Sequence, residues 1–201
     1  MLPDNKGPCR EKPAALIRNL CGGRSLSFLL LPRLFMPLEI SASSKHAELP
    51  PNQSIGIIVS TYNSHITEKL CEGAIATLTA GGISEDRIVV VRVPGAWELP
   101  FAVQRLIAVR SFAGAIALGA VIKGETSHDQ HINRAVSNTL MQLSMDHNKP
   151  IAFGLLTVNS LEQAIQRSGG NKGNKGEECA NALLECLRLG TALDRMDSLD
   201  T

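Results

Sequence analysis

The chain has 201 residues, 44% of them hydrophobic, and a formal net charge of +1, which suits one domain with extensions rather than two full domains. The near-neutral charge and the 3% aromatic content argue against a nucleic-acid partner, which would require a basic surface and stacking side chains. Five widely spaced cysteines without a CxxC pair argue against a disulfide framework and indicate a reducing compartment, here taken as the cytoplasm.

Residues 1–50 mix Pro, Ser, Gly and basic residues without helical or strand periodicity, so we expect an N-terminal extension without regular structure. Its most apolar run, "LSFLLLPRLFMPL", is interrupted by Pro32, Arg33 and Pro37 and is shorter than the roughly 18 residues that span a bilayer. We therefore expect no membrane association. Whether this segment is a targeting peptide, or is partly absent because translation starts at Met36, stays open.

A regular alternation of apolar runs and amphipathic helices begins at residue 54. Strands are predicted at 54–60, 86–93, 114–122 and 150–157, and helices at 63–82, 97–110, 129–148, 160–169 and 175–190. This order predicts right-handed crossovers and a three-layer α/β/α sandwich with a mainly parallel four-stranded sheet, flavodoxin-like in class. We assign the domain to residues 51–193 and a C-terminal tail to 194–201. Ligands of such sheets bind beyond the carboxyl ends of the strands.

The only Tyr and the only Trp of the chain both follow predicted strands. Tyr62 comes after the first strand and Trp97 after the second, within "VPGAWELP". A flat ring with a polar tip suits stacking on a planar heterocycle, although an aromatic residue at a turn also often covers the core. Glu98 could accept hydrogen bonds from ligand hydroxyls, or could simply complement the helix dipole.

The third strand runs into "GETSH", where a helix N-terminus would present free backbone N–H groups. An anion such as phosphate would fit there with the hydroxyls of Thr126 and Ser127, while the alternative is that one of them only caps the helix. His128 follows directly. Because histidine exchanges protons near neutral pH, we expect it to serve proton transfer if a substrate reaches it.

Metal and nucleotide-phosphate motifs are not supported by the sequence. His128 and His131 form a His-x-x-His pair, but no third ligand is evident, so we predict no metal. The stretch "SGGNKGNKG" at 168–176 lacks the Walker spacing, because Lys175 is followed by Gly176 and Glu177.

Six motifs in order, "STYN", "VPGAWELP", "ALGAVIKGETSH", "PIAFGLLT", "QAIQRSG" and "GNKG", resemble the lumazine synthase family over roughly residues 54–190. The resemblance implies a transferase of riboflavin biosynthesis that condenses 5-amino-6-(D-ribitylamino)uracil with 3,4-dihydroxy-2-butanone 4-phosphate. The product is 6,7-dimethyl-8-ribityllumazine, phosphate and water are released, and no metal or organic cofactor is implied.

The resemblance also implies roles for individual residues. His128 would be the general acid and base. The phosphate would bind at Gly124, Glu125 and Thr126, with Arg167 as counter-charge. The pyrimidine and ribityl chain would contact Tyr62, Asn63, Ala96, Trp97, Glu98, Val121, Ile122, Lys123, Phe153 and Lys175. Phe153, Arg167 and Lys175 would come from a neighbouring subunit of a pentamer. The resemblance also implies that pentamers could assemble into a sixty-subunit capsid, and it makes riboflavin synthase a candidate partner.

The sequence departs from the resemblance after His128. The family usually has an aromatic residue and then an acid, whereas this chain has Asp129 and Gln130. An acidic partner for the histidine is therefore lost, displaced to Asp129 or replaced by Gln130. This departure keeps a non-catalytic, flavin-binding or shell-forming protein as a rival hypothesis, and a flavodoxin-like electron carrier as a weaker one.

Overall fold

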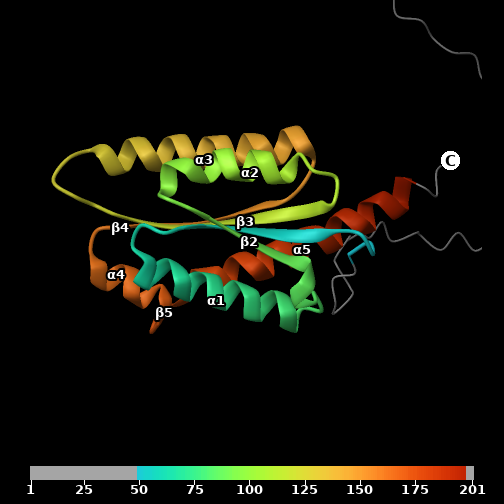
Figure 1. The fold of residues 1–201 in the computed structure, drawn as a ribbon, viewed down its shortest axis with the longest axis horizontal. Coiled ribbons are helices and arrows are strands. Elements are labelled where there is room, and N and C mark those ends of the chain that lie inside the picture. The colour runs from blue at the N-terminus through green and yellow to red at the C-terminus, as the bar shows by residue number, and fades with distance from the viewer. Residues whose placement is uncertain (1–48, 198–201) are drawn as a thin grey trace, which may run out of the picture. The chain divides into compact units, whose positions relative to one another are not determined.

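The computed structural model describes residues 49–197, and their elements alternate as the sequence predicts (Figure 1). The strands of the main sheet are β1 (Ser54–Ser60), β2 (Ile88–Val93), β3 (Phe112–Ile122) and β4 (Ile151–Val158). The helices are α1 (Ser64–Ala80), α2 (Leu99–Ile107), α3 (His128–His147), α4 (Leu161–Gln166) and α5 (Lys175–Asp197). Two 3₁₀ turns, η1 (Glu85–Arg87) and η2 (Ala96–Glu98), and a small hairpin of β5 (Ser168–Gly170) and β6 (Gly173–Asn174) complete the chain.

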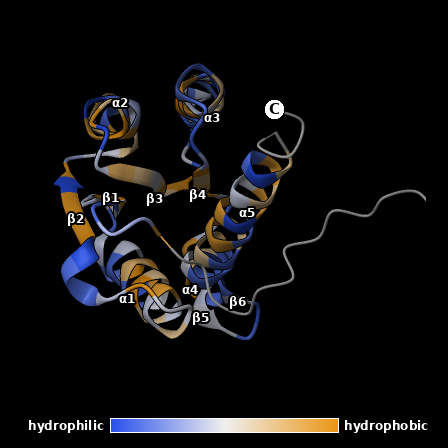
Figure 2. Ribbon diagram, turned by 90° about the vertical axis from the view of Figure 1, so that its right-hand side faces the viewer, coloured by the Kyte–Doolittle hydropathy of each residue, from blue (hydrophilic) through white to orange (hydrophobic). Residues whose placement is uncertain are grey.

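The main sheet has the strand order β2-β1-β3-β4, and all three pairings are parallel. Helices α2 and α3 cover one face, and α1, α4 and α5 cover the other (Figure 2). The predicted three-layer α/β/α fold is confirmed. Parallel strands place all their carboxyl ends at one edge, so Ser60, Val93, Ile122 and Val158 end on the same side of the sheet.

The strands β1 and β3 are central and buried on both faces, which explains their uninterrupted apolar runs. Alternate side chains of β1 enter two separate clusters: Ile57 and Val59 pack with α1 and α5, whereas Ile58 packs with α2 and α3. Such burial stabilises each side chain by about 1.5–3 kcal/mol, so the sheet is a rigid support for the residues at its edge.

Several boundaries differ from the prediction by two residues or more, and three of them have a clear local reason. The helix predicted from Trp97 begins as the turn η2, and regular α2 starts at Leu99 with Pro100 in its first turn, where a missing N–H costs nothing. Helix α4 ends at Gln166, because residues 168–174 form the β5–β6 hairpin, which the sequence did not predict. Helix α5 continues past Gly190 to Asp197, since an interior glycine costs only about 1 kcal/mol.

The predicted N-terminal extension lies, apart from residues 49 and 50, outside the described residues, as do residues 198–201 of the predicted tail. None of the helices between residues 49 and 197 combines the length and the apolar character needed to cross a membrane.

Candidate active site

A cavity of about 360 Å³ lies at the carboxyl ends of β1, β2 and β3, beside the start of α3. Its walls come from three segments that are far apart in the sequence, at residue 62, residues 95–97 and residues 120–132, and they meet because the strands are parallel. The lining residues are Tyr62, Gly95, Ala96, Trp97, Ala120, Val121, Ile122, Gly124, Thr126, His128, Asp129 and Ile132. Eight of the residues that the sequence suggested for ligand or proton contacts are therefore brought together here: Tyr62, Ala96, Trp97, Val121, Ile122, Gly124, Thr126 and His128.

The two aromatic side chains of the cavity are exposed, while their backbones are fixed. Tyr62 is 71% exposed and Trp97 is 60% exposed, so neither ring covers the core. The backbone N–H of Tyr62 donates to Pro94 O at 3.1 Å, and Glu98 Oε2 accepts from Gly95 N at 2.9 Å to close the turn that carries Trp97. Both rings are thus available to a planar ligand from well-anchored positions.

Two residues expected to contact a ligand are engaged within the chain instead and do not line the cavity. Asn63 has a left-handed conformation (φ 60°), its carbonyl accepts from Ile66 N, and its Nδ2 donates to Ala120 O at 2.9 Å. The carboxylate of Glu98 accepts the hydrogen bond from Gly95. Asn63 therefore ties the start of α1 to β3, and Glu98 shapes the η2 turn.

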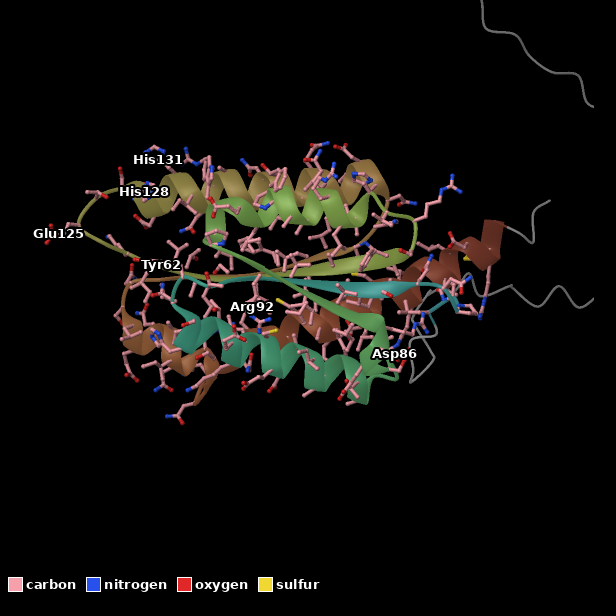
Figure 3. All side chains as sticks on the ribbon, in the orientation of Figure 1. Tyr62, Asp86, Arg92, Glu125, His128 and His131 are labelled. Carbon is pink, nitrogen blue, oxygen red and sulfur yellow. The ribbon has the colours of Figure 1, made fainter. Side chains whose placement is uncertain are left out.

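The turn between β3 and α3 leaves helix N–H groups available. Ser127 is the N-cap of α3 but makes no side-chain capping hydrogen bond, and Thr126 Oγ1 accepts only a long one, 3.4 Å, from His128 N. Gly124 and Thr126 line the cavity, so the start of α3 adjoins it. The side chain of Glu125 lies at the outer tip of the turn (Figure 3), and Lys123, which does not line the cavity either, joins β4 through its backbone N–H, which donates to Val158 O. The turn therefore offers backbone donors rather than cationic side chains.

The two histidines at the start of α3 differ in position. Both side chains are exposed, but His128 lines the cavity and His131, one turn later, does not. Figure 3 shows both at the same end of α3. Nowhere between residues 49 and 197 do three or more His, Cys, Asp or Glu side chains gather closely enough to hold a metal ion.

Asp129 enters the cavity wall in a way that the sequence did not reveal. Its Oδ1 is buried and has no hydrogen-bond partner within residues 49–197, so no bond joins this oxygen to His128. Adjacent positions of a helix point in directions about 100° apart, which explains why the two side chains do not pair. Ile132, four residues after His128, also lines the cavity, and the i to i+4 rule could have found it.

Three predicted site residues lie together elsewhere, next to the start of α5. Arg167 Nη1 and Lys175 Nζ contact the Glu178 carboxylate at 2.9 and 3.1 Å, and the Cys179 thiol donates to Phe153 O at 3.4 Å. None of Phe153, Arg167 and Lys175 lines the cavity that contains His128. We name Phe153, Arg167, Lys175 and Glu178 the α5 cluster.

Charge and burial shift two pKa values in this region. Burial raises the pKa of Glu178, but the hydrogen bonds from Arg167 and Lys175 outweigh it and hold this pKa below its usual value. Burial raises the pKa of the Cys179 thiol to about 11. Glu178 is therefore an anion at neutral pH that keeps both cations in place, and Cys179 is a protonated core thiol.

Comparisons with known proteins cover this whole region. The family model of 6,7-dimethyl-8-ribityllumazine synthase matches residues 52–191. A protein named 6,7-dimethyl-8-ribityllumazine synthase from Rhodopirellula baltica is 52% identical over 143 residues, which are 71% of this chain and 92% of the relative. Every element that lines the cavity, and the α5 cluster, falls inside the matched range.

Proposed function

The chain belongs to the 6,7-dimethyl-8-ribityllumazine synthase family, and from this premise we propose that it makes 6,7-dimethyl-8-ribityllumazine in riboflavin biosynthesis. The reaction joins 5-amino-6-(D-ribitylamino)uracil to 3,4-dihydroxy-2-butanone 4-phosphate and releases phosphate and water. The observation that carries the proposal is that every residue lining the cavity, including two exposed aromatic rings and a histidine, falls within the range that the family model matches. The protein is thus a transferase whose substrates are small molecules.

The chemistry requires proton transfers more than covalent help. The 5-amino group attacks the ketone and gives an imine after water leaves. Phosphate departs by elimination and leaves an enol, which tautomerises to a new carbonyl. The ribitylamino nitrogen attacks this carbonyl, and loss of a second water closes the ring. Each step moves a proton at or near neutral pH, and His128 is the group in the cavity wall suited to that task. Holding the two substrates in register would lower the activation free energy further than proton transfer does, because well-oriented intramolecular reactions lower it by roughly 7–11 kcal/mol.

We assign the pyrimidine to the space between the rings of Tyr62 and Trp97 and the phosphate to the start of α3. The exposure of both rings and the mainly apolar walls formed by Ala96, Val121 and Ile122 support the first assignment. The available N–H groups beside Gly124 and Thr126 support the second. Asn63 and Glu98 then act through the shape of the site rather than by direct contact.

We further propose that the α5 cluster completes the cavity of a neighbouring copy in a homo-oligomer, with a pentamer as the expected assembly. The phosphate of the butanone substrate requires a counter-charge, and the cationic candidates Arg167 and Lys175 do not reach the cavity of their own chain. Exposed apolar side chains on α2 and α3, namely Phe101, Met141 and Met145, support burial against another copy. Association of pentamers into a capsid, and binding of riboflavin synthase, remain proposals that rest on the family alone.

The cysteines support a reducing, cytoplasmic setting. Cys71, Cys179 and Cys186 are free thiols, and the first two are buried. Burial raises the pKa of both, which keeps these thiols protonated and unreactive.

The experiment that tests the function is a fluorescence assay of lumazine formation by the purified protein with both substrates. Production of 6,7-dimethyl-8-ribityllumazine above the uncatalysed rate is the expected result. If the protein instead bound lumazine or flavin tightly and formed no product, the non-catalytic binding protein would replace this proposal.

A further inference from the structure

The inward face of α3 changes from apolar to polar side chains where the helix reaches the cavity. Val136, Leu140 and Leu143 are buried on this face. Asp129 and Asn133 occupy the same stripe, each seven positions before one of these buried residues. The first two turns of the helix thus turn polar side chains toward the protein interior, at positions where an amphipathic helix ordinarily carries apolar ones.

Each of these two polar side chains has a hydrogen-bond acceptor atom to which no group of residues 49–197 donates. Asp129 Oδ1 and Asn133 Oδ1 are both buried, and neither finds a hydrogen-bond partner in the described part of the chain. Buried acceptors are almost always paired in folded proteins, because leaving one unpaired forfeits its hydration without compensation. The two residues differ in one respect: Asp129 lines the cavity, and Asn133 does not.

The two substrates of the proposed reaction differ in what they can offer Asp129. The butanone phosphate is an anion, and a carboxylate repels it. The ribitylaminouracil is rich in donors, since its ring and amino groups carry N–H and its ribityl chain carries O–H. Its position against Tyr62 and Trp97 would bring these donors to the cavity wall that Asp129 shares.

We propose that Asp129 is a substrate-binding residue that accepts a hydrogen bond from an N–H or O–H group that the ribitylaminouracil shares with the lumazine product. The inference rests on the proposed function, and it gives Asp129 a role separate from that of His128. The carboxylate selects the donor-rich substrate and keeps the anionic one at the phosphate turn. Because the unpaired acceptor destabilises the empty protein, binding and stability respond in opposite directions when it is removed.

The test compares Asp129→Leu, Asp129→Asn and the matched control Asn133→Leu in the full-length protein. Leucine removes the acceptor and keeps the number and branching of the side-chain heavy atoms, and Asn133→Leu makes the same change at the other unpaired acceptor, outside the cavity wall. Kd for 6,7-dimethyl-8-ribityllumazine is measured by fluorescence titration, KM for each substrate by the lumazine-formation assay, and Tm by thermal unfolding.

We expect Asp129→Leu to raise Kd and the KM for the uracil about 10- to 100-fold, with KM for the butanone phosphate unchanged and Tm increased. Asp129→Asn, which retains one acceptor oxygen, should give an intermediate effect, whereas Asn133→Leu should increase Tm and leave binding unchanged. Unchanged binding in Asp129→Leu would overturn the inference. It would also be overturned if Asp129→Leu dissociated the oligomer while KM for the uracil stayed unchanged, because the donor to Asp129 would then come from another copy of the chain.

The two proposals fail differently. A wild-type protein that binds the lumazine but forms none disproves the catalytic function and leaves the Asp129 inference open to confirmation by Kd. An active wild type whose Asp129 variants bind normally disproves the inference alone. A wild type that neither binds nor reacts overturns both.

Discussion

At the scale of single residues, the proposed function assigns stacking, proton transfer and anion binding to different side chains. Tyr62 and Trp97 are exposed rings on anchored backbone, His128 stands at the first turn of α3, and Arg167 lies outside the wall. This division means that a substitution at one position should impair one step of the reaction and spare the others. His128 is the clearest example.

His128→Ala should lower kcat by about 10²- to 10⁴-fold without abolishing turnover, because proton shuttling is lost while the positioning of both substrates remains. His131→Ala is the matched control, since His131 is an exposed histidine one turn away that does not line the cavity. Steady-state kinetics of the two variants beside the wild type check this. Equal kcat in wild type and His128→Ala would remove the proton-transfer role.

At the scale of elements, α5 is held closely against its neighbours at its start and loosely at its end. A Cβ on Gly176 would collide with the carbonyl oxygen of Leu70 in α1, and Asn174 bridges the two segments by donating to Lys69 O and accepting from Gly176 N. Around Gly190, near the other end of the helix, a Cβ would meet no atom within 4 Å among residues 49–197. The close approach at Gly176 fixes the orientation of the α5 cluster relative to α1.

Gly176→Ala should destabilise the protein by about 3 kcal/mol or more, because the helix and the backbone of α1 must separate. Gly190→Ala, a matched change in the same helix, should instead stabilise by about 0.5–1 kcal/mol through helix propensity. Urea unfolding at equilibrium measures both. A similar small effect of the two substitutions would show that α1 and α5 can separate at little cost.

Burial of Cys179 between α5 and β4 predicts a loss of stability at alkaline pH. The folded thiol has a pKa of about 11 against an ordinary value of 9.0, so the unfolded chain binds fewer protons between these values. Stability is therefore full below about pH 9 and falls by about 2 kcal/mol as the pH rises toward 11.

Cys179→Ser keeps a hydroxyl that can donate to Phe153 O but has no thiol to ionise, so its stability should depend less on alkaline pH than that of the wild type. Cys186→Ser, on the exposed side of α5, is the control. Unfolding in urea at pH 7 and about pH 10 distinguishes them. Identical pH dependence of wild type and Cys179→Ser would rule out this thiol as the cause.

At the scale of the whole molecule, the separation of the cavity from the α5 cluster suggests a site shared between copies. Each chain would supply His128 to one cavity and Arg167 to the next, so no single chain would form a complete site. In a closed ring every cavity has a neighbouring chain that can supply Arg167, and for this reason we expect a cyclic homo-oligomer.

Arg167→Ala alone should raise KM for the butanone phosphate, whereas Arg92→Ala, which breaks an exposed ion pair with Glu68, should leave it unchanged.

Mixing unfolded Arg167→Ala and His128→Ala chains in equal amounts and refolding them together should then restore activity at about one quarter of the sites, if sites are shared between randomly assembled copies. Activity no higher than the mean of the two separate variants would place each site within one chain and would contradict the proposed sharing.

The alternation of strands and helices, the parallel sheet and the family all follow from the amino-acid sequence. Periodicity reports local geometry, and strand ends in a parallel sheet must meet, which is why Tyr62, Trp97, Thr126 and His128 could be grouped from their positions in the chain. The order of several motifs was specific enough to indicate the reaction.

Which side chains are free to meet a ligand depends instead on tertiary packing. Asn63 and Glu98 already have partners, residues 168–174 form a hairpin, and the α5 cluster lies away from the cavity. The unpaired oxygen of Asp129 is a feature of the same kind. All of these depend on how helices rotate and pack against the sheet, and contacts between residues distant in sequence leave no periodic signal from which they could be read.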